Sequence, residues 1–191
     1  MSLFEFVLVM VSLVLAIGVT HLLREVAAIV RHRDSLELDW IPLTWVATLF
    51  LYAVSYWWAL WDFRELEWTF PGFFFLLIAP TLLYVAISLV VSADVAGPGA
   101  SLTTSFERVR FPFMVVLGVF QILVTWDGAA FGTEPVWNVL RALQLLLLGA
   151  IILGASSSSR KIQGVAAAVT FGALLFVTFG LRFVPGAFGP S

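Results

Sequence analysis

The sequence predicts an all-α protein, a polytopic transmembrane helical bundle with six spans. Hydrophobic residues make up 61% of the 191 residues and charged residues only 12%, which is about half the charged share of a typical soluble domain. Six apolar segments, most of them close to the 20 or so residues that cross a bilayer core, alternate with short polar loops. Helices are expected because a lipid-exposed backbone must satisfy its own hydrogen bonds, and runs of alternating polarity are absent.

The six predicted spans fill one domain that covers residues 1–191. The first span is long and has no Lys or Arg before Arg24, so it is interpreted as a retained span and not as a cleaved signal peptide. The start of the fourth span is left open, because residues 106–110 are also compatible with an amphipathic turn. The longest connection, 92–105, contains Gly-Pro-Gly and is expected to be mobile. In chain order the spans cover about 3–30, 41–61, 70–91, 111–126, 135–153 and 162–181.

The distribution of cations predicts an orientation with both termini outside. Short cytoplasmic loops carry an excess of Lys and Arg. The connections after the fifth, third and first spans hold the pairs Arg160 and Lys161, Arg108 and Arg110, and Arg31 and Arg33. The opposite connections hold only Arg64, although Arg182 near the end of the sixth span argues weakly against this orientation. The expected location is therefore a bacterial inner (plasma) membrane.

The fifth span carries the strongest polar pattern in the chain. Glu134, Asn138, Arg141 and Gln144 follow one another at steps of four, three and three, which places them on one face of a helix. This stripe leads from the outer surface towards the middle of the membrane. A cation in hydrocarbon costs about 2.5–3.5 kcal/mol on insertion scales, so the stripe is expected to face protein or water.

Three further polar residues are candidates for an outer vestibule around Arg141. They are the outer carboxylates Asp62 and Asp127, and Gln121 on the fourth span. In the functional interpretation Arg141 attracts an anionic group or gates a polar pathway, while the amides orient a solute. In the structural interpretation Arg141 snorkels to the surface or closes a buried ion pair that fixes helix packing.

His21 and Glu25 form a second candidate group, one helical turn apart near the end of the first span. An imidazole beside a carboxylate is suited to a proton relay. The structural alternative is that both side chains are solvated at the inner membrane surface.

Trp residues gather on the predicted outer side, where an aromatic belt and a ligand-binding surface are both possible explanations. Spans two and four both end in Trp-Asp, at residues 61–62 and 126–127, which either records a duplicated hairpin or reflects two independent interface signals. The sixth span carries Gly164, Ala168 and Gly172 at small-xxx-small spacing, which predicts close helix packing there.

Several classes of function are disfavoured by composition. The chain has no Cys and only two His, so neither a thiolate metal site nor a bis-histidine haem within one chain is expected. We expect no cofactor, no catalytic activity and no nucleic-acid partner, because catalytic motifs and basic blocks are absent. The leading hypothesis is a small transporter or channel-like protein that takes a solute or ion. The alternative is a non-transporting membrane subunit or sensor that binds a partner protein or a second copy of itself.

Overall fold

The computed structural model describes residues 3–90, 101–133 and 136–181, and within these ranges the regular elements are helices joined by turns and loops, without a strand. Six helices are long and apolar enough to cross a membrane, which confirms the predicted all-α fold and is compatible with a multi-pass integral membrane protein. The elements are α1 (Leu3–Arg31), α2 (Trp40–Ala59), the 3₁₀-helix η1 (Leu60–Phe63), α3 (Phe70–Val90), α4 (Leu102–Ala130), α5 (Val139–Ser156), α6 (Arg160–Phe176) and the π-helix η2 (Val177–Leu181).

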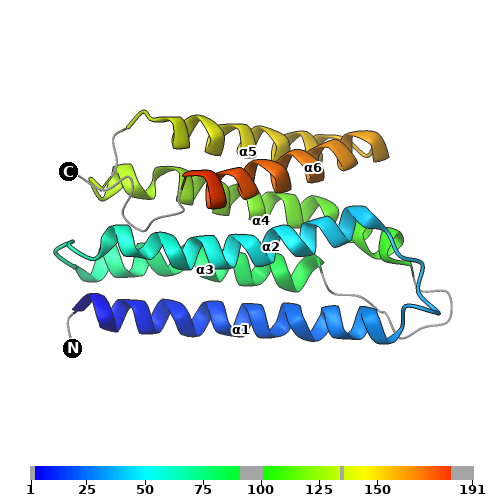
Figure 1. Ribbon diagram of the computed structural model, residues 1–191, viewed down its shortest axis with the longest axis horizontal. Helices are drawn as coiled ribbons and strands as arrows, with labels where there is room; N and C mark the ends of the chain where they lie inside the picture. The colour runs from blue at the N-terminus through cyan, green and yellow to red at the C-terminus, as the bar shows by residue number, and fades with distance from the viewer. Residues whose placement is uncertain (1–2, 91–100, 134–135, 182–191) are drawn as a thin grey trace.

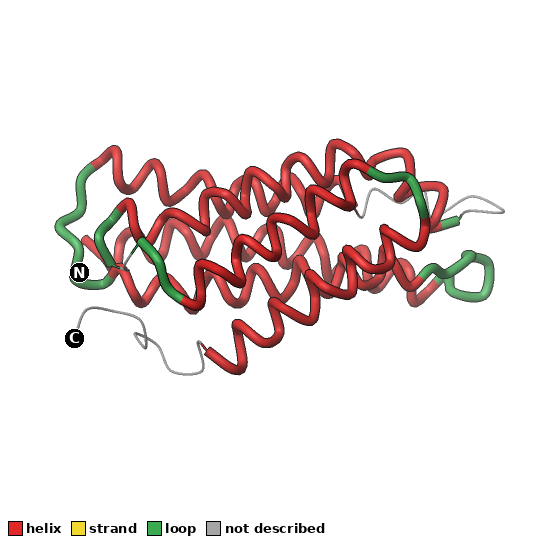
Figure 2. The backbone as a smooth tube through the Cα atoms, turned by 90° about the horizontal axis from the view of Figure 1, so that it is seen from above, coloured by secondary structure: helices red, strands yellow, loops and turns green. Residues whose placement is uncertain are grey.

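The six helices run up and down in a bundle (Figures 1 and 2), and the sequence makes its two ends chemically different. Neighbouring helices pack around it in the order α1, α3, α4, α5, α6, α2, and α2 also contacts α3 across it. We call one end the Trp-rich end: α1 begins there, and the α2–α3 and α4–α5 connections lie there with Trp61, Trp68 and Trp137. We call the other the basic end, where the α1–α2 and α5–α6 connections lie with Arg33 and Lys161.

Apolar side chains fill the bundle and also cover its outside. Within the core the Trp45 and Phe113 rings meet edge to face at 5.4 Å between centroids, and both side chains are fully buried. On the outside Leu13, Ile17 and Val165 are more than half exposed. An apolar surface spread over several helices is unfavourable in water and suits a lipid environment.

The fourth helix begins at Leu102, well before residue 111, where the predicted span begins. Arg108 and Arg110 therefore belong to α4 and not to the preceding loop, of which residues 91–100 lie outside the described ranges. Within this longer helix the Arg110 guanidinium contacts α5: its Nη1 donates to the carbonyl oxygens of Gly154 at 2.8 Å and Ser157 at 2.9 Å. These bonds cap the end of α5, where helix carbonyls otherwise lack partners.

Asp39 joins three helices at the basic end. Its carboxylate accepts the backbone N–H of Ile41 at 3.1 Å and so caps the start of α2. It also accepts the Thr103 hydroxyl of α4 at 2.8 Å and both guanidinium nitrogens of Arg160 of α6 at 2.9 Å each. Burial alone raises the pKa of this carboxyl, but the hydrogen bonds from Arg160, Ile41 and Thr103 outweigh it and hold the pKa below its ordinary value. We call these four residues the Asp39 cluster.

Only one of the three small residues of α6 makes the predicted close contact. Gly164 is buried, and a Cβ there would lie 2.9 Å from the ring of Trp40 on α2. Ala168 is exposed, and a Cβ on Gly172 would meet nothing within 4 Å. The buried face of α6 instead runs through Ala167 and Thr170, because the small-residue stripe follows a different face of the helix.

Candidate functional site

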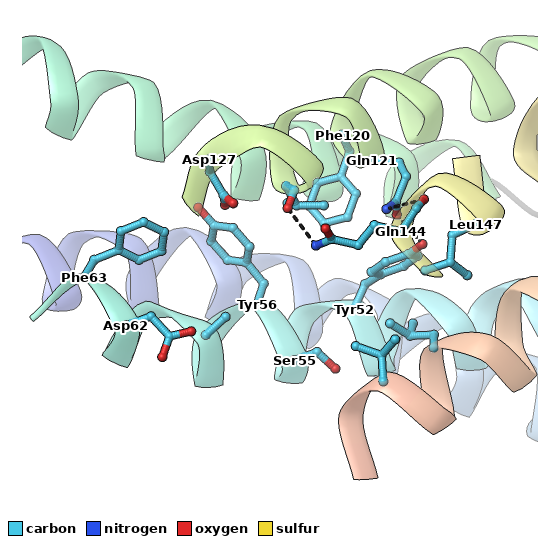
Figure 3. A pocket seen from close by; sticks show the side chains of 14 residues that line it. Tyr52, Ser55, Tyr56, Asp62, Phe63, Phe120, Gln121, Asp127, Gln144 and Leu147 are labelled. Carbon is cyan, nitrogen blue, oxygen red and sulfur yellow. Dashed lines mark hydrogen bonds between the residues drawn. The ribbon is translucent and has the colours of Figure 1, made fainter. Parts of the chain in front are cut away.

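A cavity whose lining is mainly apolar but includes several polar side chains lies between α2, α4, α5 and α6, in the half of the bundle nearer the Trp-rich end (Figure 3). The space between the side chains that line it amounts to about 590 Å³, part of which is open solvent. Tyr52, Ser55, Tyr56 and Ala59 line it from α2, at the three- and four-residue steps that share a helix face. Sites between the helices of a bundle commonly bind small ligands.

The side-chain amide of Gln121 has protein partners at both its oxygen and its nitrogen. It is 1% exposed, and its amide oxygen accepts the Tyr52 hydroxyl at 2.6 Å. Its amide nitrogen donates to Thr125 Oγ1 and to the backbone oxygen of Gln144, both at 3.3 Å. This network links α2, α4 and α5, and its donors and acceptors are matched within the protein.

Gln144 is different, because one of its side-chain atoms has no protein partner. The side chain extends across the cavity wall towards α4 and donates from Nε2 to the Val124 backbone oxygen at 2.9 Å (Figure 3). Its Oε1 is buried and accepts no hydrogen bond, although the residue lines the cavity and is 9% exposed. The bond to Val124 fixes which end of the amide is the oxygen. An unmatched buried acceptor costs free energy, about 1–3 kcal/mol, unless something in the cavity donates to it.

The hydroxyl groups around the cavity donate their protons to acceptors of the protein. Tyr56 donates to the Leu76 backbone oxygen at 2.8 Å. Thr178 donates to the Leu174 backbone oxygen at 2.8 Å, so Ser55, whose Oγ lies 2.7 Å from Thr178 Oγ1, is the donor of that pair. These hydroxyls therefore present oxygen lone pairs, and not protons, to the cavity.

Two carboxylates, Asp62 and Asp127, line the end of the cavity nearer the Trp-rich end, from η1 and from the last turns of α4 (Figure 3). Each follows a Trp that is exposed, Trp61 and Trp126. The Trp-Asp sequences thus place an aromatic ring on the surface and a carboxylate in the cavity wall. Among the described residues that line the cavity, these two side chains bear formal charges and both are negative.

Arg141 lies outside the cavity lining and close to the start of its helix. The structure differs here from the predicted stripe, because α5 begins at Val139 and Asn138 is its N-cap. The Asn138 backbone is extended and its side chain accepts the Arg141 N–H at 2.7 Å, so Asn138 does not continue the helical face. Asn favours this position because its oxygen satisfies a helix N–H that lacks an intrahelical partner. Glu134 lies outside the described residues.

The Arg141 side chain is 1% exposed, and its guanidinium carbon lies 5.0 Å from the centre of the Trp126 ring. An aromatic face stabilises a desolvated cation by about 2 kcal/mol. Four of the predicted vestibule residues line this one cavity: Asp62, Gln121, Asp127 and Gln144. Arg141 is not among the residues that line it.

His21 and Glu25 lie on α1, remote from the residues that line the cavity, and both are partly buried. The His21 ring packs 6.4 Å from the Tyr84 ring on α3. Among the described residues, no hydrogen bond or ion pair joins the side chains of His21 and Glu25, and the proton relay stays a prediction. No group of three or more potential metal ligands occurs within the described ranges.

Tyr52, Tyr56 and Ser55 belong to the site but were not among the residues predicted from sequence. Their spacing along the second span could have identified them, because three hydroxyl groups on one face of an apolar helix need hydrogen-bond partners inside the protein. Comparison with protein-family models, with curated proteins and with solved structures found no match for this chain.

Proposed function

We propose that this protein is a small transporter or channel-like protein whose solute enters through the cavity between α2, α4, α5 and α6. One observation supports this proposal above the others: a helix bundle with an apolar exterior contains a cavity whose mainly apolar lining includes two carboxylates, Asp62 and Asp127, and two amides. Polar groups inside a membrane bundle carry an energetic cost and commonly mark a solute pathway.

The proposal includes an inner (plasma) membrane location with the Trp-rich end outside, as the cation distribution favours. The exposed Trp61 and Trp137 at that end suit the membrane interface, where indole rings are enriched. With this orientation the cavity lies in the outer half of the bundle, and the proposed route of the solute passes Asp62 and Asp127.

Flux through purified protein in liposomes tests the transport step. Stopped-flow light scattering is recorded after an osmotic jump with glycerol, KCl, ammonium chloride or methylammonium chloride, against protein-free liposomes. Leu147→Trp fills the inner part of the cavity, where Leu147 is 1% exposed, and is expected to reduce the flux of the active solute at least fivefold, by blocking a wall that the solute must contact. Asp34→Asn, at an exposed carboxylate of the basic end, serves as the control and should leave the flux unchanged.

If none of these solutes enters faster than into protein-free liposomes, the transport proposal is rejected. The same holds if Leu147→Trp folds normally and leaves the flux unaltered. The alternative, a non-transporting subunit that binds a partner, then takes its place and is examined by stoichiometric co-purification.

The orientation has a direct test because the natural sequence has no Cys. Single-cysteine variants are made at two exposed positions, Glu67→Cys in the α2–α3 connection and Ser158→Cys in the α5–α6 connection. A membrane-impermeant maleimide applied to intact cells is expected to label the first variant and to label the second only after permeabilisation. The reverse pattern contradicts the proposed orientation.

A further inference from the structure

We infer that the exposed face of α1 near the basic end binds an anionic phospholipid, whose phosphate lies between Arg24 and Arg31. This surface lies outside the cavity, so the inference depends neither on transport nor on the orientation of the protein. It follows from the exposure of one face of α1, from the level of Arg24 along the bundle and from the lack of protein partners for both guanidinium groups.

One face of α1 is exposed as the helix approaches the basic end. The helix lies at the edge of the bundle (Figure 1) and packs against α3 and α2, with Leu15, Gly18 and Leu22 among its buried residues. A set of exposed residues recurs at alternating steps of four and three, which places them on one helix face. In chain order they are Leu13, Ile17, Thr20, Arg24, Ala27 and Arg31. This face is therefore apolar in its first part and cationic towards the basic end.

Arg24 lies at the level where the apolar part of the bundle ends. Both α1 and α3 begin at the Trp-rich end, and a Cβ on Gly18 would lie 3.3 Å from Ile87 Cδ1 and 3.8 Å from Tyr84 Cα of α3. Arg24 is six residues further along α1, so it is level with the last turn of α3, which ends at Val90. Charged residues are absent from α3. An exposed cation at the edge of such an apolar layer places its charge among lipid head groups.

Neither guanidinium group has a partner within the described part of the chain. Arg33, in the turn that follows α1, pairs with Asp34 at 3.6 Å. Arg24 and Arg31, by contrast, form no hydrogen bond or ion pair with any described residue. Glu25 is partly buried, and its position is rotated by about 100° around the helix from that of Arg24. Both arginines are thus available to an anion outside the protein.

A phospholipid fits this face in its head group and in its acyl chains. The Cα atoms of Arg24 and Arg31 are about 10 Å apart along the helix axis, and an Arg side chain is long enough to cover half of that distance. A guanidinium group binds a phosphate through two parallel N–H···O hydrogen bonds. Leu13 and Ile17 are each more than half exposed on the same face, where they offer a surface to acyl chains. A soluble phosphate would make no use of this apolar part.

A lipid retention experiment with the full chain tests the inference. Protein immobilised through an affinity tag is equilibrated with neutral detergent micelles that contain equal amounts of dioleoyl phosphatidylglycerol and dioleoyl phosphatidylcholine. These lipids share their acyl chains, and only the first has a net negative charge. The retained lipid is extracted and quantified by mass spectrometry, with protein-free resin as the blank. The wild type is expected to retain phosphatidylglycerol at least tenfold over phosphatidylcholine, because each basic side chain near an anionic lipid contributes a factor of about five in affinity.

The double variant Arg24→Gln with Arg31→Gln removes both charges and keeps polar side chains. It is expected to lower the preference for phosphatidylglycerol at least fivefold. The matched control, Arg33→Gln with Lys161→Gln, removes the same number of positive charges from two other exposed positions of the basic end and should change the preference less than twofold. Gel filtration and thermal unfolding identify variants that lose lipid because they are misfolded.

Equal retention of the two lipids by the folded wild type overturns the inference. An equal loss of preference in the two folded double variants also overturns it, since the attraction would then come from the overall charge of the basic end. Replacement of NaCl by sodium phosphate at equal ionic strength should leave phosphatidylglycerol bound. Its displacement would show that the anion alone is recognised and would overturn the assignment to a phospholipid. A protein that retains the lipid but moves no solute keeps this site and loses transport, and the converse result keeps transport alone.

Discussion

The Asp39 cluster at the basic end and the cavity nearer the Trp-rich end both gather polar groups inside an apolar bundle, yet they differ in how completely those groups are matched. Asp39 accepts four hydrogen bonds from Ile41, Thr103 and Arg160 on three helices. Gln144, in contrast, keeps one buried acceptor without a protein partner. In a cluster whose polar groups all have protein partners, the hydrogen bonds hold the helices together. A buried acceptor without a protein partner is instead able to accept a hydrogen bond from a ligand.

The largest effect is expected at the matched end. Asp39→Ala removes the cap of α2 together with the bonds to Thr103 and Arg160, and we expect a loss of about 3 kcal/mol in the free energy of unfolding. Arg160→Ala should cost only about 1 kcal/mol, because the Arg160 side chain is 58% exposed and solvent screens its charge. Thermal or denaturant unfolding in detergent micelles measures both, and equal losses would contradict a carboxylate-centred cluster.

The contribution of the Asp39 charge to the free energy of unfolding should also depend on pH. Because hydrogen bonding holds the folded-state pKa of Asp39 below its ordinary value, the added stability is complete above the unfolded pKa, near 4, and is lost as the pH falls through the lower folded pKa. The difference in unfolding temperature between wild type and Asp39→Asn should therefore shrink below about pH 4. A difference that is constant from pH 7 to pH 3 would exclude this linkage.

A smaller loss is expected at Gln121, the matched amide of the cavity. Gln121→Leu keeps the side-chain volume but leaves the buried Tyr52 hydroxyl without its acceptor, so the free energy of unfolding should fall by about 2 kcal/mol. The double variant with Tyr52→Phe removes both members of the pair and should recover part of that loss. Without such recovery, the hydrogen bond is not the cause.

The smallest effect on stability is expected at Gln144. Gln144→Leu gives up the bond to the Val124 oxygen but also removes the unmatched Oε1, so the two changes nearly cancel and the free energy of unfolding should stay within about 1 kcal/mol of wild type. A loss as large as that of Gln121→Leu, in protein without ligand, would show that Gln144 is a structural residue and would erase the contrast between the two amides.

The fold and part of the site could be predicted from sequence because both follow from the pattern of apolar segments and of the polar residues that interrupt or end them. Six apolar segments fix the helices, and the Trp-Asp sequences at the ends of two of them mark the carboxylates that the structure brings to one cavity. Asn138 shows where this approach fails. Its spacing fits a helix face, but its side chain caps the helix from outside, and periodicity does not distinguish these two roles of a polar residue.

The Asp39 cluster was not predicted because its partners lie far apart in sequence. Thr103 is 64 residues from Asp39, and Arg160 is 121 residues away. One local signal was available: an Asp directly before an apolar run is a favourable N-cap. That signal gives the start of α2, whereas the link to α4 and α6 depends on which helices are neighbours, and hydropathy does not determine that order.

The last described turn of α6 is the π-helix Val177–Leu181, and it contributes Val177 to the cavity and Thr178 to the bond with Ser55. A π turn holds one residue more than an α turn between hydrogen-bonded partners. If this segment changed to α-helical pairing, Thr178 and the side chains that follow it within the turn would rotate by roughly 100° about the helix axis. A shift of one residue in hydrogen-bond register would thus separate Thr178 from Ser55 and release the end of α6 from α2, with the five other helices and the Asp39 cluster left in place.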